Sequence, residues 1–329
     1  MPITAPEKRG GKRYFMEETA PAIERIKKEI GKRIVGQDYM IDGMLIGLLA
    51  GGHILIEGVP GLAKTLAIKS LAETLKMDFH RIQFTPDLLP ADLIGTLAYK
   101  YQTGEFFVRK GPLFSHVVLA DEINRAPAKV QSALLESMEE KQVTIGDTSY
   151  KLPEPYFVMA TQNPIEHEGT YPLPEAQLDR FLMKLNVTYP TAEEEMEILA
   201  REDRDKENAL HTTIEQVMNP DTVRALRGEI KKVTIDEKIN RYIVSIVAST
   251  REPSPYLEFG ASPRASLALH RCAKVRAFLR KRTYILPEDV KDVVHDVLRH
   301  RIILSYEAES EELAPDDIIS ALLDKLPVP

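Results

Sequence analysis

Short apolar runs alternate with amphipathic segments from about residue 14 to residue 190 of the chain. Several of the runs lack polar alternation, which is typical of parallel strands buried on both faces of a sheet. The runs cover residues 53–56, 79–84, 117–120, 157–160 and 181–187. Between them, residues such as Val130, Leu134 and Met138 recur at helical spacing. This succession predicts an α/β fold with a mostly parallel sheet and helices on both faces.

Two stretches interrupt this alternation. Residues 97–108 carry aromatic-rich runs on either side of a polar turn at 102–105, and residues 143–152 carry alternating runs around Gly146-Asp147. Strand-like runs around a short polar turn predict β-hairpins inserted into the α/β framework. Each hairpin is either a working loop or a cover for a sheet edge.

The pattern divides the chain into three parts. Residues 1–13 are polar and rich in Pro, Gly and Lys, and we expect a flexible N-terminal arm. Residues 14–190 form the α/β domain, with a boundary near Thr188 to Thr191. Residues 191–329 show helical spacing with little strand signal, which predicts a small all-α domain.

Composition narrows the class of protein. A chain of 329 residues suggests two domains, and its net charge of −7 argues against a surface built throughout for nucleic acid. The single cysteine, Cys272, excludes an intrachain disulfide framework and fits a reducing compartment. The N-terminus lacks an apolar run of signal-peptide type, and polar or glycine residues interrupt the longest apolar region, 41–56. We therefore expect a cytoplasmic protein with no membrane span.

The strongest chemical motif follows the first buried run and opens a helix at Leu66. Glycines there let the backbone fold around an anion, and the helix N-terminus adds positive potential for phosphates. Lys64 would reach the β and γ phosphates of ATP, and the Thr65 hydroxyl would coordinate Mg²⁺. Ala63 stands where the usual motif has Gly, and it can serve if its φ is negative. Otherwise the segment is a glycine-rich turn that binds nothing. The expected phosphate-binding residues are Gly58, Pro60, Gly61, Leu62, Ala63, Lys64, Thr65 and Leu66.

Two carboxylates follow the buried run at 117–120. Asp121, at the carboxyl end of that strand, would hold Mg²⁺ directly or through water, while Glu122 would polarise the attacking water. Asp-Glu after a strand is a weak signal alone, because it could simply start a loop. Its position after the phosphate loop, with one strand between, makes it a strong one.

Three further residues are candidates for the same site. Asn163 ends the run at 157–160 and could orient water near the γ phosphate, although Asn163-Pro164 could also be an ordinary turn. Arg180 and Arg264 could stabilise charge on a transferring phosphoryl group, and such an arginine can come from a neighbouring chain. Taken alone, either arginine reads as a surface salt bridge.

These motifs, taken in this order along the chain, resemble those of the AAA+ ATPases, and their sequences are most similar to those of the MoxR family. The segments that carry the resemblance are residues 58–65, Asp121-Glu122-Ile123-Asn124-Arg125-Ala126, Ala160-Thr161-Gln162-Asn163-Pro164 and residues 175–181. The likeness covers nearly the whole chain after the N-terminal arm. An alanine at the position of Ala63 is common in this family.

The resemblance implies specific roles and partners. It implies a P-loop AAA+ core with two inserted hairpins and a helical lid. Asn163 would be sensor 1, Arg180 an arginine finger acting across a subunit interface, and Arg264 sensor 2. Val35 and Gly36 would line the adenine pocket. Family members typically form hexameric rings that mature or remodel client proteins, often with a von Willebrand factor A-type partner. We expect ATP to lie between the α/β domain and the lid, and hydrolysis to change the lid angle and move the hairpins against a client.

Three alternatives are weighed against this interpretation. A GTPase is disfavoured because no Asn-Lys-x-Asp or Thr-Lys-x-Asp segment exists. A nucleic-acid motor could use the seven Lys and Arg residues between 261 and 287, but aromatic residues are sparse there and nucleic acid is an improbable partner. A nucleotide-gated scaffold with negligible turnover stays open, although the presence of Glu122 argues against it.

Overall fold

The computed structural model describes residues 12–164, 169–204 and 213–329. Most of the predicted arm, residues 1–11, lies outside the described residues. The last two arm residues, Lys12 and Arg13, instead begin helix α1 (Lys12–Gly31).

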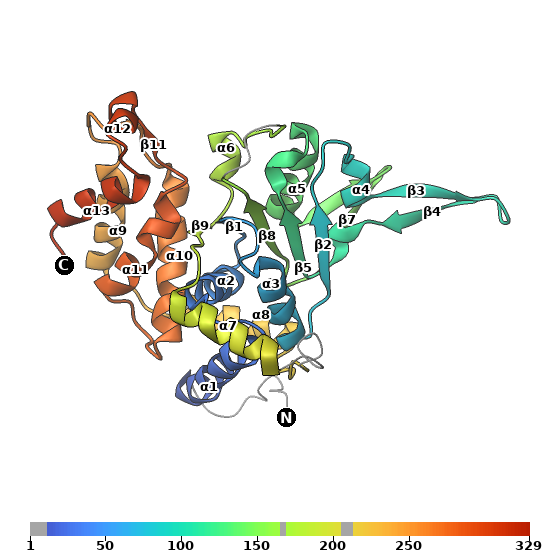
Figure 1. The fold of residues 1–329 in the computed structure, drawn as a ribbon, viewed down its shortest axis with the longest axis horizontal. Coiled ribbons are helices and arrows are strands. Elements are labelled where there is room, and N and C mark those ends of the chain that lie inside the picture. Colours follow the sequence, from blue (N-terminus) through green and yellow to red (C-terminus); the bar gives the residue numbers. More distant parts are fainter. Residues whose placement is uncertain (1–11, 165–168, 205–212) are drawn as a thin grey trace.

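The predicted parallel sheet is confirmed (Figure 1). Its strands are β1 (Ile54–Glu57), β2 (Phe79–Gln83), β5 (Val117–Asp121), β8 (Phe157–Gln162) and β9 (Met183–Asn186). They lie in the order β2-β5-β8-β1-β9, and every neighbouring pair is parallel. The carboxyl ends of β1, β5 and β8 therefore meet at one edge, where ligands of open α/β sheets bind.

Side chains along the central strands β1, β5 and β8 alternate between two cores. Ile54 and Ile56 pack on one face with α1, α2 (Asp38–Ala50) and α3 (Lys64–Thr74). Leu55 packs on the other face with α5 (Ala128–Glu140) and the short helix α4 (Pro90–Ile94). Because both faces of the central strands β1, β5 and β8 are covered, these strands are apolar along most of their length, which explains the continuous runs in the sequence.

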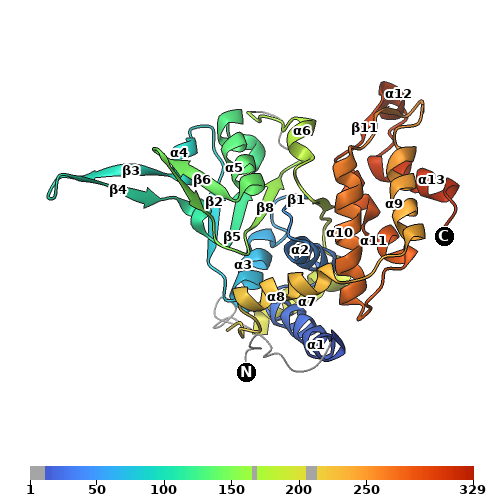
Figure 2. The same cartoon turned by 180° about the vertical axis from the view of Figure 1, so that it is seen from behind.

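Both predicted hairpins are present. β3 (Gly95–Lys100) pairs with β4 (Glu105–Lys110), and β6 (Gln142–Ile145) pairs with β7 (Thr148–Lys151), each pair antiparallel. The β3–β4 hairpin projects far from the body of the molecule (Figures 1 and 2). Short elements η1 (Pro112–Phe114), η2 (Ile123–Arg125) and α6 (Glu175–Leu178) complete this part of the chain.

The C-terminal part is helical, as predicted. Helices α7 (Ala192–Arg204) and α8 (Pro220–Lys231) lie beside α1, α2 and α3 beneath the sheet (Figures 1 and 2). The remaining helices form a separate bundle: α9 (Glu237–Ser249), α10 (Pro263–Leu279), α11 (Pro287–Leu298), α12 (Tyr306–Ser310) and α13 (Pro315–Lys325). A short pair, β10 (Leu257–Phe259) and β11 (Ile303–Leu304), lies within it. Among the described helices, none has the length and apolar character that crossing a membrane requires.

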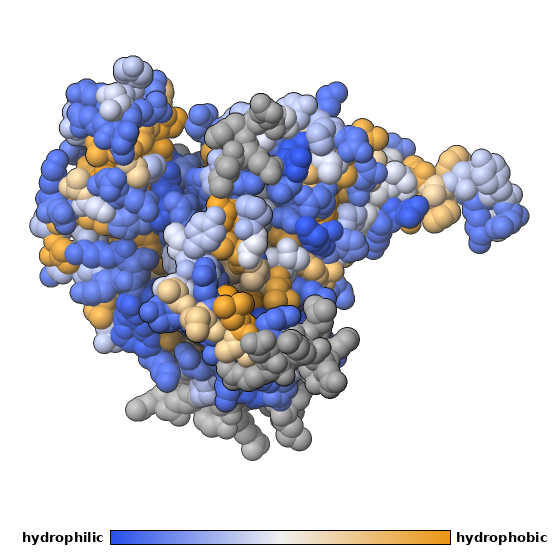
Figure 3. Space-filling model, viewed as in Figure 1, coloured by the Kyte–Doolittle hydropathy of each residue, from blue (hydrophilic) through white to orange (hydrophobic). Residues whose placement is uncertain are grey.

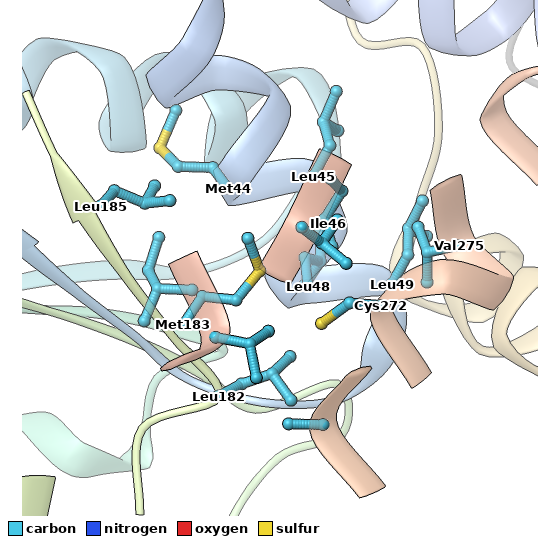
Figure 4. Close-up of a cluster of buried hydrophobic side chains, with 14 of the residues drawn as sticks. Met44, Leu45, Ile46, Leu48, Leu49, Leu182, Met183, Leu185, Cys272 and Val275 are labelled. Carbon is cyan, nitrogen blue, oxygen red and sulfur yellow. The ribbon is translucent and has the colours of Figure 1, made fainter. Parts of the chain in front are cut away.

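An apolar joint fixes this bundle, the lid, to the α/β domain. Cys272 and Val275 of α10 lie against the α2 leucines, and Met183 of β9 and the preceding Leu182 border the same cluster (Figure 4). These side chains belong to the same continuous core as the lower face of the sheet. The lid is therefore attached by ordinary close packing over a wide area.

Candidate nucleotide-binding site

One cleft of about 420 Å³ opens at the carboxyl ends of the parallel strands. It brings together the phosphate loop, the two carboxylates and Asn163, which the sequence predicted from three separate segments. Its lining residues are Pro60, Gly61, Leu62, Ala63, Lys64, Thr65, Leu66, Arg81, Asp121, Glu122, Thr161, Gln162 and Asn163. Gly58 lies at the start of the same loop, directly after β1.

The backbone of the loop has the conformation that a phosphate cradle requires. A Cβ on Gly58 would lie 2.8 Å from the carbonyl oxygen of Val187, so only glycine fits there. Gly61 has φ of 89°. Ala63 has φ of 54° and precedes the first residue of α3. The negative φ that we expected for an alanine at this position is therefore wrong. This position takes the left-handed conformation because the loop must turn sharply into the helix, which explains why glycine is usual there.

Lys64 lies inside the cradle. Its Nζ donates a hydrogen bond of 2.6 Å to the carbonyl oxygen of Gly58, which keeps the side chain folded back over the loop. Burial lowers the pKa of Lys64, while the nearby charges of Asp121 and Glu122 act in the opposite direction. The ammonium group therefore stands as a point charge between the loop and the two carboxylates.

Thr161 organises the two carboxylates, and the sequence did not assign it a role. Its hydroxyl donates to Asp121 Oδ1 at 2.6 Å and accepts from the backbone N–H of Glu122 at 2.9 Å. Glu122 has φ of 57°, so this N–H bond holds a residue in the left-handed region. The polar end of β8, where Thr161 stands between Ala160 and Asn163, was the available signal.

Residues of β2 also enter the site. Arg81 donates to Asp121 Oδ2 through Nη2 at 2.7 Å and Nε at 3.0 Å, and Gln83 donates to Glu122 Oε2 at 2.8 Å. Arg125 forms an ion pair with the same Glu122 oxygen at 3.1 Å. Arg81 and Gln83 could not be assigned from the sequence, because they become part of the site only when β2 pairs with β5.

Val35 and Gly36 do not line the described cleft. They precede α2, where Gln37 donates from Nε2 to the carbonyl oxygen of Thr188 at 3.3 Å. A Cβ on Gly36 would overlap the carboxylate of Glu194 in α7. The predicted adenine-binding segment therefore lies against the start of α7, and its role stays a prediction.

Arg180 and Arg264 lie together in a second cavity of about 320 Å³, between α5, the residues before β9, and α10. Both bind the carboxylate of Glu139: Arg180 Nη1 lies 2.8 Å from Oε2, and Arg264 Nη2 lies 3.0 Å from Oε1. Among the described residues, none lines both this cavity and the cleft of Lys64. All described residues lining that cleft precede residue 164, so neither Arg264 nor the lid lines it within this chain.

The donor set of the cleft fits a magnesium ion that arrives with phosphates. Mg²⁺ usually takes one or two carboxylates together with phosphate oxygens and water. Asp121 and the Thr65 hydroxyl are oxygen donors of that kind on adjoining sides of the cleft. Within the described ranges, no group of three or more His, Cys, Asp or Glu residues forms a candidate metal cluster. A cage built from protein alone is thus not what this site offers.

Comparison with known proteins decides the family. The model of the ATPase family associated with various cellular activities (AAA) matches residues 53–183, and the model of the AAA lid domain matches residues 251–322. Chaperone MoxR1 of Mycobacterium tuberculosis is 46% identical over 315 residues, covering 93% of this chain and 82% of that protein. The chain belongs to the MoxR family of AAA ATPases.

Two further similar proteins match this chain along nearly the whole length of both sequences. Protein MoxR of Methylorubrum extorquens is 31% identical over 330 residues, covering 94% of this chain and 95% of that protein. A crystal structure from Cytophaga hutchinsonii superposes with a TM-score of 0.89 at 52% identity, covering 96% of this chain and 97% of that one. As an AAA ATPase, this MoxR-family chain binds nucleotide and hydrolyses ATP.

Proposed function

We propose that this MoxR-family ATPase hydrolyses magnesium-bound ATP in the cleft around Lys64, completed by Arg180 and Arg264 of a neighbouring chain in a ring. Turnover then drives the remodelling or maturation of client proteins. The observation that carries the proposal is the separation of these two arginines from the cleft of their own chain.

The residues of the cleft have distinct roles in this proposal. The loop N–H groups and the N-terminus of α3 bind the phosphates, and Lys64 neutralises their charge. Thr65 and Asp121 would hold Mg²⁺, which supplies charge neutralisation on the phosphate oxygens when bound. Glu122 accepts a proton from the attacking water, and Asn163 orients that water. Thr161 keeps Asp121 and Glu122 in fixed relation through its two hydrogen bonds.

Arg180 and Arg264 act in trans. Because both arginines pair with Glu139, they share a location and can approach one anionic group together. An arginine directed at a neighbour's γ phosphate can raise the hydrolysis rate by about 10³-fold or more. A head-to-tail contact between identical chains that closes on itself gives a ring, and we propose a hexamer.

The β3–β4 hairpin is our candidate for client contact. Tyr101 is 91% exposed and Phe106 is 70% exposed, and Tyr99 packs between them with ring centroids 5.2 and 5.1 Å away. In Figure 3, hydrophobic colour covers part of the projecting hairpin, while its tip is hydrophilic. The relative MoxR1 is named a chaperone, which supports a client protein as the partner. A von Willebrand factor A-type protein is a second proposed partner.

The structure favours a protein client over nucleic acid. Most basic residues between 261 and 287 already have acidic partners on the same chain. Arg276 pairs with Asp42 and Asp292, and Arg282 pairs with Asp289. Cations engaged in this way do not form the free basic stripe that tracks a phosphate backbone.

The test is the ATPase rate of Arg180→Ala, measured at protein concentrations where the assembly forms. We expect kcat to fall by about 10³-fold, with ATP binding retained because the phosphate loop is intact. Arg241→Ala is the matched control, since Arg241 is an exposed lid arginine that pairs with Glu237 of the same helix, α9. A wild-type rate for Arg180→Ala would sink the trans-acting role.

Mixing experiments add direction to this test. Arg180→Ala chains have intact clefts, and Glu122→Gln chains have intact arginines, so a mixed ring contains complete interfaces and regains activity. Lys64→Ala mixed with Glu122→Gln stays inactive, because both changes damage the same cleft. An Arg180→Ala chain that Glu122→Gln fails to rescue contradicts the proposed interface.

A further inference from the structure

The segment that carries Arg180 is held by the lid. Arg301, which follows α11 and is 9% exposed, donates from Nε to Asp179 Oδ1 at 2.8 Å. The same guanidinium donates to the carbonyl oxygen of Leu182 at 3.1 Å and to that of Asp179 at 3.3 Å. Next to it, His300 Nε2 lies 3.1 Å from the carbonyl oxygen of Phe181. The lid thus holds the side chain of Asp179 and the backbone on both sides of Arg180.

The other oxygen of Asp179 binds a second lid element. Ser262 Oγ donates to Asp179 Oδ2 at 2.9 Å. Ser262 is also the N-cap of α10, where its hydroxyl accepts from the backbone N–H of Arg264 at 3.2 Å. The Asp179 carboxylate therefore lies next in sequence to Arg180. Through the Ser262 hydroxyl it is also linked to the start of α10, which carries Arg264.

Attachment of the lid does not need this polar cluster. The apolar joint of α10 with α2 and β9 already fixes the lid (Figure 4). A buried ion pair contributes little net stability compared with apolar residues of similar volume. Its directional bonds do set orientation, because an arginine fork and a carboxylate meet in a narrow range of geometries.

We infer that Asp179 is a positioning residue for catalysis, which orients Arg180 and Arg264 as one unit toward the nucleotide of a neighbouring chain. The inference rests on the proposed trans-acting function. The lid and the Arg180 segment then move as one body, so a change in lid position carries both arginines with it. Glu139 holds the tips of the two side chains, and Asp179 fixes their bases.

The first test is the ATPase activity of Asp179→Asn, which keeps the shape of the side chain and removes its charge. We expect kcat to fall by about tenfold to a hundredfold with KM for ATP within twofold, since displacement of a catalytic group by an ångström can cost that much. Asp289→Asn is the matched control, because Asp289 is a buried lid carboxylate that, like Asp179, is paired with arginine, in its case Arg280 and Arg282. It should lower thermal stability and leave kcat unchanged.

Mixing with Glu122→Gln chains separates positioning from general damage. With Glu122→Gln chains in excess, we expect each Asp179→Asn cleft to regain the wild-type rate, as each Arg180→Ala cleft does, because its neighbour then supplies well-oriented arginines. If Arg180→Ala is rescued and Asp179→Asn is not, Asp179 acts within its own chain and the inference is overturned. If Arg180→Ala itself is not rescued, the proposed trans function fails first.

A second variant keeps the inference testable if Asp179→Asn does not fold. Ser262→Ala removes one of the lid's two hydrogen-bond donors to the Asp179 carboxylate, at a half-buried helix start. We expect kcat to fall by about threefold to tenfold, with the same rescue by Glu122→Gln. Ser305→Ala, which removes the N-cap of α12, is its control. A wild-type kcat for Ser262→Ala would show that the shared carboxylate does not orient α10.

Discussion

Replacing Thr161 with valine tests how the two carboxylates of the cleft are held. Valine has nearly the same shape, and Thr161 is only 1% exposed, so the change removes the hydroxyl without opening a cavity. The lost bonds are the one donated to Asp121 at 2.6 Å and the one accepted from the N–H of Glu122 at 2.9 Å.

The expected size follows from these two bonds. A hydrogen bond to a charged group contributes about 1.5–3 kcal/mol to stability, and a neutral one contributes about 1 kcal/mol. The added buried methyl group returns about 0.8 kcal/mol. We therefore expect Thr161→Val to lower the free energy of unfolding by about 2–3 kcal/mol. We also expect kcat to fall at least about tenfold, because Asp121 and Glu122 both lose the hydrogen bond that positions them.

Urea unfolding and steady-state ATPase assays measure the two effects. Thr161→Ser is the control, since it keeps the hydroxyl and removes only a methyl group. If Thr161→Val and Thr161→Ser hydrolyse ATP at the same rate, the hydroxyl does not organise the carboxylates and the reasoning fails.

Two further predictions concern stability. Ala63→Gly should raise the free energy of unfolding by about 0.5–1 kcal/mol. Glycine removes the strain of about 1–2 kcal/mol that the left-handed conformation imposes on alanine, but the greater conformational entropy of glycine in the unfolded chain offsets part of this gain. Thermal unfolding measures this, and a destabilised Ala63→Gly would contradict the assigned backbone strain. Burial lowers the pKa of His53 to about 3, so the folded protein holds it neutral while the unfolded chain protonates near pH 6.5. The stability that neutral His53 contributes to the folded protein is therefore complete above about pH 6.5 and is lost as pH falls. At pH 5 this lowers the free energy of unfolding by about 2 kcal/mol. His53→Gln should reduce the loss of stability between pH 7.5 and pH 5, and an unchanged slope would refute the assignment.

Much of the fold could be predicted from the hydrophobic pattern, since strands buried on both faces have few polar positions. The runs at 117–120 and 157–160 match β5 and β8 closely for that reason. Both hairpins followed from their turns. The phosphate loop and the carboxylates were also predictable, because each comes directly after such a strand.

The remaining parts of the site depend on long-range geometry. Arg81 meets Asp121 only because β2 is the neighbour of β5, which the sequence order of the strands does not reveal. Arg264 was expected beside the nucleotide of its own chain, but the packing of α10 on α2 places it beside Arg180. The φ of Ala63 was likewise a property of the closed loop.

The most direct test of the account compares ATP binding and ATP hydrolysis for the wild-type chain and Glu122→Gln. Glu122→Gln leaves the phosphate loop, Thr65 and Asp121 unchanged, so we predict ATP binding with wild-type affinity and a hydrolysis rate lower by at least about 10²-fold. Equal rates at the level of background for both proteins would contradict the assignment of this cleft as the site of hydrolysis.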